Sequence, residues 1–324
     1  MGVIDERRRL GRRGPLVTRL GLGTAPLGNL FTTVTDADAA ATVDAAWDGG
    51  IRFFDTAPLY GHGLAEHRLG RALAARPRDE FVIGTKVGRL LRPSSGTSAP
   101  GVFMDVPDVE PVFAYSRDDT LRSIEASLER LGMDRVDVVH VHDPDDHEVE
   151  AMIGAFPALI ELRDQGVIGA VGAGMNQWEM LDRFVQRVDL DCVLLAGRYT
   201  LLDRSGADVL LPRCADRGVG VVIGGVFNSG LLADPDANAT YDYVAASGAL
   251  RERAWDLQER ARSGGVTLRA AALQFALTHP AVTSVVVGAR TAQEVHDDLA
   301  DAEFAIPPSL TTELGFDPQD LTRP

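Results

Sequence analysis

Short apolar runs rich in β-branched residues alternate with longer amphipathic stretches along nearly the whole chain. Such alternation is typical of repeated strand–helix–strand units, in which each helix returns the chain to begin the next parallel strand. The pattern therefore confines the chain to the α/β class. Eight runs are predicted to be strands, at residues 17–22, 52–55, 81–85, 136–141, 170–173, 193–195, 219–223 and 284–287.

The strands are predicted to be parallel and covered on both faces. The runs at 219–225 and 282–288 are apolar at consecutive rather than alternate positions, which favours burial on both sides. Eight such strands with helices between them predict a (β/α)8 TIM barrel. The length of 324 residues suits one barrel, and no internal repeat or linker marks a second domain, so we expect residues 1–324 to form a single barrel domain.

Helix signals agree with this order of elements. Asp36 precedes an alanine-rich stretch that continues to Trp47, and the glycine pair at 49–50 ends it. Ser116 precedes a second amphipathic run, which ends at the glycine of residue 132. Both segments are therefore predicted to be helices.

Two segments are too long to be simple connections. Residues 88–115 contain four prolines and little helical periodicity, and the segment after residue 232 reads DPDANATYDY. Each follows a predicted strand. Loops at the carboxyl ends of barrel strands build the active site, so we expect both insertions to be loops that cover a substrate pocket.

The charge balance and the cysteine count limit the classes of function. The chain has 32 basic and 47 acidic residues, a net charge of −15, which disfavours binding to nucleic acid. The arginines between residues 7 and 13 are interpreted as a solvated segment. No run approaches the roughly 20 apolar residues that span a bilayer, so no membrane association is expected. Cys192 and Cys214 give no disulfide framework or metal spacing, which favours a reducing cytoplasm. The oligomeric state is left open.

Four side chains with acid–base or charge-stabilising chemistry fall at or shortly after predicted strand ends: Asp55, Tyr60, Lys86 and His142. A phenol is a poor acid–base catalyst at neutral pH, but a nearby ammonium group favours its phenolate form. Lys86 could supply that charge, with Asp55 as its counter-ion. Alone, each residue would more simply be a cap, a packed aromatic or a solvated strand end, so their coincidence at one end of the barrel carries the hypothesis.

The chain resembles the aldo-keto reductase superfamily over most of its length. The resemblance rests on GLGTAPLG at 21–28, FFDTAPLYGHGLAEHRLGRAL at 53–73, TKVGRLL at 85–91, SLERLGMDRVDVVHVHDP at 127–144 and VVVGARTAQEV at 285–295. VGAGMNQWEML at 171–181 and GGVFNSGLL at 224–232 look like the branch of L-fucose (D-threo-aldose) 1-dehydrogenases and pyridoxal 4-dehydrogenase. The resemblance implies an oxidoreductase in which Tyr60 is the general acid–base, Lys86 lowers its pKa, Asp55 pairs with the lysine and His142 orients the reacting oxygen.

The resemblance also implies that the barrel itself holds a nicotinamide cofactor, because no GxGxxG motif follows a strand. The wider family has side-chain donors for the carboxamide where this chain has Gly174, Met175 and Ala196, so Asn176 or a backbone amide is expected to replace them. Glu294 stands where relatives that prefer NADP often have an arginine, which favours NAD although Arg290 is close by. The implied cofactor contacts are Thr24, Asp55, Gly174, Met175, Asn176, Val226, Phe227, Asn228, Gly230, Leu231, Gly288, Ala289, Arg290, Glu294 and Asp298.

The expected substrate is a sugar hemiacetal, or a small alcohol or aldehyde, oxidised to a lactone or an aldehyde. The substrate pocket is expected to include Tyr60 and His142, with Trp178, Arg198, Tyr199 and Phe227 around them. Arg198 could equally pair with Asp203 as a structural residue. The alternatives are a pyridoxal 4-dehydrogenase or a general aldehyde and ketone reductase.

Two other classes of protein share part of this pattern. His140 and His142 lie two residues apart, as in metal-dependent barrel hydrolases, but no other strand end supplies the further imidazoles of a binuclear site, so no metal is expected and His140 is interpreted as a packing residue. Some members of the superfamily are cofactor-binding subunits of potassium channels. The dehydrogenase-like motifs make this non-enzymatic role the weaker hypothesis.

Overall fold

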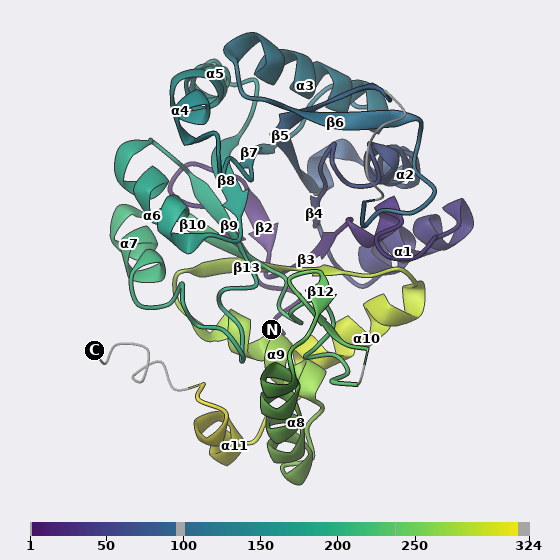
Figure 1. Cartoon of the computed structure of the whole chain (residues 1–324), viewed down its shortest axis with the longest axis vertical. Coiled ribbons are helices and arrows are strands. Elements are labelled where there is room, and N and C mark those ends of the chain that lie inside the picture. The colour runs from purple at the N-terminus through teal and green to yellow at the C-terminus, as the bar shows by residue number, and fades with distance from the viewer. Residues whose placement is uncertain (1, 95–100, 237, 317–324) are drawn as a thin grey trace.

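A computed structural model describes residues 2–94, 101–236 and 238–316. Its centre is a closed ring of eight parallel strands, in which β4 pairs with both β3 and β5 (Figure 1). The strands of the ring are β3 (Leu20–Gly23), β4 (Phe53–Asp55), β5 (Val82–Pro93), β7 (Val138–His142), β8 (Ala170–Met175), β9 (Cys192–Ala196), β10 (Gly220–Gly224) and β13 (Val282–Gly288). The predicted (β/α)8 barrel is therefore confirmed.

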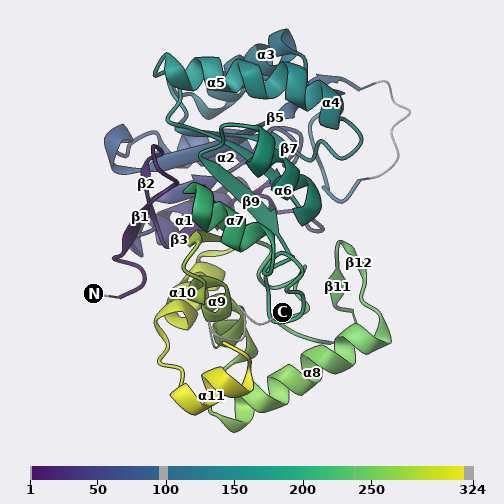
Figure 2. The ribbon, with the colours of Figure 1, turned by 90° about the vertical axis from the view of Figure 1, so that its left-hand side faces the viewer.

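Helices surround the ring of strands (Figure 1). They are α1 (Asp36–Asp48), α2 (Leu64–Leu73), α3 (Arg117–Leu131), α4 (Glu148–Glu150) continuing through a π-helical turn (Ala151–Ala155) into α5 (Phe156–Asp164), α6 (Trp178–Arg187), α7 (Leu210–Arg217), α9 (Leu268–Thr278) and α10 (Ala292–Glu303). Two more, α8 (Gly248–Ser263) and α11 (Pro308–Glu313), extend from the body of the barrel (Figure 2). Short 3-10 turns lie at Pro26–Gly28 and Arg78–Glu80.

The two helices expected from capping signals are confirmed. Helix α1 starts one residue before the signal at Asp36 indicated: Thr35 is its N-cap and accepts a hydrogen bond from the backbone of Asp38, and Asp36 is the first helical residue. Helix α3 begins after Ser116, whose side chain accepts from the backbone of Asp119, and it ends at Gly132 with φ of 64°. Local sequence chemistry therefore set these boundaries.

The first predicted strand, 17–22, is two strands in the structure. Strand β2 (Leu16–Thr18) pairs antiparallel with β1 (Arg7–Arg9), whereas β3 joins the barrel between β13 and β4. The arginines predicted to be solvated are thus partly in a hairpin, and Arg13 binds the carboxylates of Asp189 and Asp191 at 2.8 and 3.0 Å. Arg7, Arg9, Arg12 and Arg13 are nevertheless exposed, so the segment is solvated as predicted although part of it is paired in a hairpin.

The hairpin β1–β2 covers the barrel end from which the strands start. Leu10 and Val17 are fully buried there and join a cluster inside the barrel with Phe53, Val138 and Val222. A larger apolar cluster lies between the strands and the helices. The barrel interior is therefore packed at its amino-terminal end, which leaves its polar side chains to the opposite end.

The two long insertions contain structure of their own. Strand β5 continues beyond its barrel partners and pairs antiparallel with β6 (Val109–Ala114), so the expectation of a loop throughout 88–115 is wrong. Residues 88–93 read GRLLRP, without clear alternation, and prolines lie in both strands of the hairpin, so local sequence gives little signal for it. After β10, strands β11 (Thr240–Tyr241) and β12 (Val244–Ala245) form a second, short hairpin.

Candidate active site

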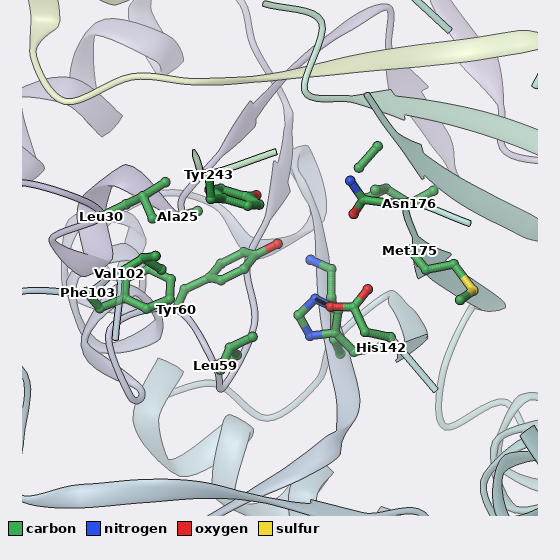
Figure 3. A pocket seen from close by; sticks show the side chains of 15 residues that line it. Ala25, Leu30, Leu59, Tyr60, Val102, Phe103, His142, Met175, Asn176 and Tyr243 are labelled. Carbon is green, nitrogen blue, oxygen red and sulfur yellow. Dashed lines mark ion pairs between the residues drawn. The ribbon is translucent and has the colours of Figure 1, made fainter. Parts of the chain in front are cut away.

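A cavity lies where the barrel strands end (Figure 3). Side chains from the ends of β5, β7 and β8 form its floor, and both insertions contribute to its walls. The expectation that the insertions cover a pocket is thus met by Val102, Phe103 and Tyr243. The lining residues are Ala25, Leu30, Leu59, Tyr60, Lys86, Val102, Phe103, His142, Asp143, Gly174, Met175, Asn176, Leu194, Ala196 and Tyr243.

Lys86 and Asp55 form a buried ion pair beneath the cavity. The Lys86 ammonium lies 2.5 Å from the Asp55 carboxylate and donates a second hydrogen bond, of 2.9 Å, to the carbonyl of Thr56. Both side chains are almost completely buried. Burial raises the pKa of the Asp55 carboxyl group, and the Lys86 charge opposes that rise. The pair brings together two strands of the ring, β4 and β5, and fixes the ammonium position.

Tyr60 lies on the turn after β4 and faces this ion pair. The Lys86 nitrogen is 4.7 Å from the centre of the Tyr60 ring, and the His142 ring meets it edge to face at 5.8 Å between centroids. Figure 3 shows the Tyr60 hydroxyl directed into the cavity, with His142 and Asn176 on the opposite side. Phe103 packs near the other side of the phenol, at 6.3 Å between ring centroids. The four side chains singled out from the sequence therefore converge.

The turn that carries Tyr60 is held by a close backbone contact. A Cβ atom at Gly28 would lie 2.6 Å from the backbone nitrogen of Gly61, and Gly61 itself has φ of 61°. Only glycine fits such an approach in that conformation. The loop after β3 therefore touches the loop after β4 directly, beside Tyr60.

The expectation that Lys86 lowers the pKa of Tyr60 is wrong for this structure. Burial, and secondarily the negative charge of Asp55, raise the pKa of the Tyr60 phenol well above its ordinary value. The reason is that the Asp55 carboxylate, at 2.5 Å, offsets the charge of Lys86. In the protein as described, Tyr60 is therefore a protonated phenol at neutral pH.

His142 is a neutral imidazole at neutral pH. Burial, together with the positive charges of Lys86 and Arg89, holds its pKa well below the ordinary histidine value. His140, two residues earlier on the same strand, is fully buried and its Nε2 lies 3.5 Å from Sγ of Cys192. Burial lowers the pKa of His140 to about 3. These contacts agree with the interpretation of His140 as a packing residue.

A groove continues from the cavity along the ends of β10 and β13, and it shares Ala25, Leu30 and Tyr243 with the cavity. Several expected cofactor contacts line this groove or the cavity. Those in the groove are Val226, Phe227, Gly230, Gly288, Arg290, Glu294 and Asp298, and those in the cavity are Gly174, Met175 and Asn176.

Five expected cofactor contacts line neither the groove nor the cavity, and one of them, Asp55, is buried in the ion pair with Lys86. Leu231 and Ala289 are fully buried in the apolar core, so their side chains are directed away from it. Asn228 is buried and donates to the carbonyl of Gly197 at 3.2 Å. Thr24 is fully buried, and its backbone amide donates to the carbonyl of Asp55 at 2.9 Å. A linear motif does not show which of its side chains turn inward.

The groove fits an elongated dinucleotide such as a nicotinamide cofactor. Its wall after β10 has successive left-handed residues, Asn228, Ser229 and Gly230, with φ of 46°, 58° and 102°. Such backbone is suited to presenting amide groups to an anion. Farther along, the guanidinium groups of Arg269 and Arg290 add positive charge, and Nε of Arg290 is buried without a partner in the described residues.

The acidic residues at the far end of the groove are already engaged. Glu294 accepts a hydrogen bond of 2.7 Å from the backbone of Arg290, and its carboxylate also lies 3.8 Å from the Arg290 guanidinium. Arg269, which sequence analysis missed, binds Asp298 at 2.6 Å and lies over the Phe227 ring at 5.0 Å. Burial raises the pKa of the Asp298 carboxyl group to about 7.

Four residues expected around the substrate do not line the cavity, and one of them, Phe227, lines the groove instead. Arg198 binds Asp242 of the second hairpin through two hydrogen bonds of 2.7 and 3.1 Å, and lies 3.8 Å from Asp203, so it is a structural residue here. Tyr199 is fully buried and stacks near Phe275. Trp178 packs against the apolar core and does not line the cavity.

Two cavity residues missed by the sequence analysis have polar groups. Asp143 directly follows His142, and only this adjacency could have indicated it. Tyr243 belongs to the hairpin β11–β12, and its ring lies 6.0 Å from that of Phe31 across the groove. Sequence gives no signal for such a contact, because the two residues are more than 200 positions apart.

Within the described residues, no group of three or more histidine, cysteine or acidic side chains is arranged to bind a metal ion. Across the same described part of the chain, none of the helices combines the length and apolar character needed to traverse a bilayer.

Known proteins resemble this chain over most of its length. The model of the Aldo/keto reductase family matches residues 19–314. A D-threo-aldose 1-dehydrogenase from a Pseudomonas species is 42% identical over 313 residues, which cover 93% of this chain and 94% of that protein. Pyridoxal 4-dehydrogenase from Microbacterium luteolum is 41% identical over 331 residues, covering 96% of each chain.

Among solved structures, an aldo-keto reductase from Bacillus halodurans, in its holo form, is similar in fold. The TM-score is 0.75 at 24% sequence identity, with 98% of this chain and 96% of the other covered. At that identity the likeness supports the barrel architecture alone.

Proposed function

The chain belongs to the aldo/keto reductase family of oxidoreductases that act on CH–OH groups with nicotinamide cofactors, and from that premise we propose that it oxidises the anomeric hydroxyl of an aldose. The observation that carries this proposal is the convergence of Tyr60, Lys86 and His142 in a cavity continuous with an extended groove. The product would be a lactone. In this proposal the substrate is a small sugar.

Tyr60 is proposed as the group that exchanges a proton with the reacting oxygen. Its hydroxyl faces the cavity, and its ring lies 4.7 Å from the Lys86 ammonium, which is paired with Asp55. A nicotinamide cofactor, when bound, accepts the hydride from the carbon being oxidised. In oxidation Tyr60 takes the hydroxyl proton, and in reduction its phenol returns it.

His142 and Lys86 have supporting roles in this proposal. The neutral imidazole of His142 donates or accepts a hydrogen bond at the reacting oxygen without bringing a charge. The ammonium of Lys86 lies next to the phenol ring and stabilises negative charge as it develops on the Tyr60 oxygen. Asp55 holds that ammonium in place at 2.5 Å.

Support for an aldose comes from the relatives and from the lining of the cavity. One relative of 42% identity is named as a D-threo-aldose 1-dehydrogenase. The cavity offers polar groups beyond the four central residues, namely Asp143, Asn176 and Tyr243, among apolar walls. Polar groups placed within an otherwise apolar pocket orient a polyhydroxylated ligand.

A second candidate is oxidation of the primary alcohol of pyridoxal. The aromatic side chains of Phe103 and Tyr243 line the cavity, where they could flank a pyridine ring, and a relative of 41% identity is named as a pyridoxal 4-dehydrogenase. The two candidates share the same acid–base residues and differ in the groups that contact the rest of the substrate.

Turnover distinguishes them. Purified protein is incubated with NAD or NADP and with L-fucose, D-arabinose, L-galactose or pyridoxal, and formation of the reduced cofactor is followed by absorbance. The aldose proposal expects kcat/KM for at least one sugar to exceed that for pyridoxal. Faster oxidation of pyridoxal favours the second candidate, and absence of turnover with every substrate contradicts both.

NAD is proposed as the preferred cofactor. The Glu294 carboxylate lies in the groove and would repel the 2′-phosphate of NADP, although its contact with Arg290 at 3.8 Å offsets part of that charge. The ratio of kcat/KM for NAD to that for NADP should exceed one, and Glu294→Gln should lower it by about fivefold, as expected for loss of roughly 1 kcal/mol of repulsion. Gln293→Ala, on the adjacent exposed position, is the control. A ratio below one in the unmodified protein would refute the preference.

A further inference from the structure

Asp143 has a carboxylate in the cavity that the mechanism above does not use. It follows His142, the last residue of β7, and lines the cavity beside Tyr60 and Asn176. Its Oδ2 atom lies 3.4 Å from Nε2 of His142. In the proposed mechanism His142 contacts the reacting oxygen of the substrate. A carboxylate this close to the imidazole therefore lies near that oxygen as well.

The backbone of Asp143 is fixed from several sides. Its amide donates to the carbonyl of Gly174 at 3.0 Å, and its own carbonyl accepts from the Tyr115 hydroxyl at 2.9 Å and from Arg89 at 3.4 Å. Arg89 and Tyr115 also bind the carbonyl of His142, at 3.2 and 2.7 Å. Both side chains are buried. The positions of the imidazole and the carboxylate are therefore coupled.

These contacts hold Asp143 in an uncommon backbone conformation, with φ of 40°. A non-glycine residue at positive φ persists only where the surroundings determine it, and such residues cluster at functional sites. In this conformation Asp143 lines the cavity. Asparagine and glycine both tolerate this conformation, which makes them suitable replacements.

The carboxylate is available to a ligand. Apart from the contact with His142, no hydrogen bond to its side chain occurs in the part of the chain that the structure describes. Burial raises the pKa of Asp143 to about 6, with the charge of Arg89 opposing the rise, so the group is largely ionised at neutral pH. A half-buried carboxylate without a donor gains most from a hydroxyl group brought by a substrate.

We propose that Asp143 accepts a hydrogen bond from the hydroxyl on the carbon next to the reacting carbon, and so selects 2-hydroxy aldoses. The inference rests on the proposed oxidation of an aldose. His142 meets the reacting oxygen, and Asp143 Oδ2, 3.4 Å from the imidazole, meets the neighbouring one. Leu30, Leu59 and Met175 make much of the cavity wall apolar, and Asp143 is the carboxylate among its lining residues.

The consequence is discrimination against 2-deoxy sugars. A site that places a polar group for a substrate hydroxyl rejects the analogue without it, because the group is then left desolvated and unpaired. A hydrogen bond to a charged group corresponds to about a 10- to 100-fold difference in kcat/KM. The unmodified protein is thus expected to prefer each aldose over its 2-deoxy counterpart by about that factor.

The test measures this preference in variants of Asp143. The pairs are L-fucose with 2-deoxy-L-fucose, and D-arabinose with 2-deoxy-D-ribose, which is its 2-deoxy counterpart. Asp143→Gly removes the acceptor and keeps a residue that tolerates positive φ, and it should reduce the preference to about one. Asp143→Asn keeps a neutral acceptor and should retain part of the preference. Thermal unfolding and cofactor binding establish that each variant is folded.

Asp146→Asn is the matched control, because it removes the same charge from an exposed position three residues away. It should leave the preference unchanged. If Asp143→Gly and Asp143→Asn keep the full preference while turning over the sugars, the inference is wrong and the proposed function stands. If the unmodified protein oxidises no aldose with either cofactor, the proposed function fails, and this inference fails with it.

Discussion

At the residue scale, the chemistry of Tyr60 depends on two opposite charges that lie close together. Lys86 is near enough to stabilise a phenolate, yet Asp55 binds that same ammonium at 2.5 Å and offsets its field. Burial then dominates, and the phenol keeps its proton. Tyr60 is therefore poised as an acid, and it acts as a base only after it has lost that proton.

Replacing Tyr60 by phenylalanine removes the hydroxyl and retains the ring that packs near Phe103. Because a positioned acid–base group contributes about 10²- to 10⁴-fold, kcat should fall by that factor while cofactor affinity stays within about twofold. Steady-state kinetics and cofactor fluorescence titration measure the two quantities. An unchanged kcat would remove Tyr60 from the proton transfer.

The raised pKa of Tyr60 gives opposite pH dependences to the two directions of reaction. Oxidation needs the phenolate, so its kcat/KM should increase as the pH rises above neutrality. Reduction needs the phenol, so its kcat/KM should stay level through neutral pH and decline only at strongly alkaline pH. Profiles in both directions check this. An oxidation rate already level below pH 7 would show that the phenol ionises earlier than its burial predicts.

At the element scale, the hairpin β11–β12 links the outside of the barrel to the groove. Arg198, at the end of β9, binds Asp242 within the hairpin turn, and the next residue, Tyr243, reaches the ring of Phe31 at 6.0 Å. Phe31 belongs to the loop after β3. Two loops from separate strands therefore meet at the groove, where both Phe31 and Tyr243 line it.

Weakening the attachment of this hairpin should accelerate cofactor release. Asp242→Asn removes the two-fold pairing with Arg198, which we expect to contribute about 1 kcal/mol, so the dissociation rate should rise by about fivefold. Stopped-flow displacement of the reduced cofactor measures that rate. Asp234→Asn, at an exposed position of the same segment, should leave it unaltered. Equal rates in both variants would mean that the hairpin does not limit release.

At the scale of the whole molecule, the two ends of the barrel serve different purposes. The amino-terminal end is closed by the hairpin β1–β2, with Leu10 and Val17 inserted among side chains of the barrel interior. The opposite end carries the cavity, the groove and both insertions. Stability and chemistry should therefore respond separately to substitutions at the two ends.

Leu10→Ala tests this separation. Loss of a fully buried leucine side chain should lower the free energy of unfolding by about 2–5 kcal/mol, while kcat remains within about twofold, since the site is at the other end. Leu16→Ala, in the same hairpin but 50% exposed, should change the free energy of unfolding by less than about 1 kcal/mol. Urea denaturation gives the stabilities. A large fall in kcat for Leu10→Ala without loss of stability would contradict the separation.

The sequence by itself determined the eight strands, their parallel order and the convergence of four distant side chains. It could do so because burial on both faces leaves consecutive apolar positions, and because parallel strands bring their carboxyl ends to one edge. Residues 55, 60, 86 and 142 follow from these two facts. The capping residues Thr35 and Ser116 likewise act through neighbours within one turn.

Tertiary structure alone decided which side chains face the site and what charge they carry. Arg198 binds Asp242, and Leu231 is buried in the core. Asp143 and Tyr243 line the cavity, and Arg269 lines the groove. The protonation of Tyr60 was likewise set by burial and by the Asp55 charge. The local sequence pattern indicates the period of a strand or helix. The desolvation of a side chain and its pairing with a charged partner depend instead on distances in the folded molecule.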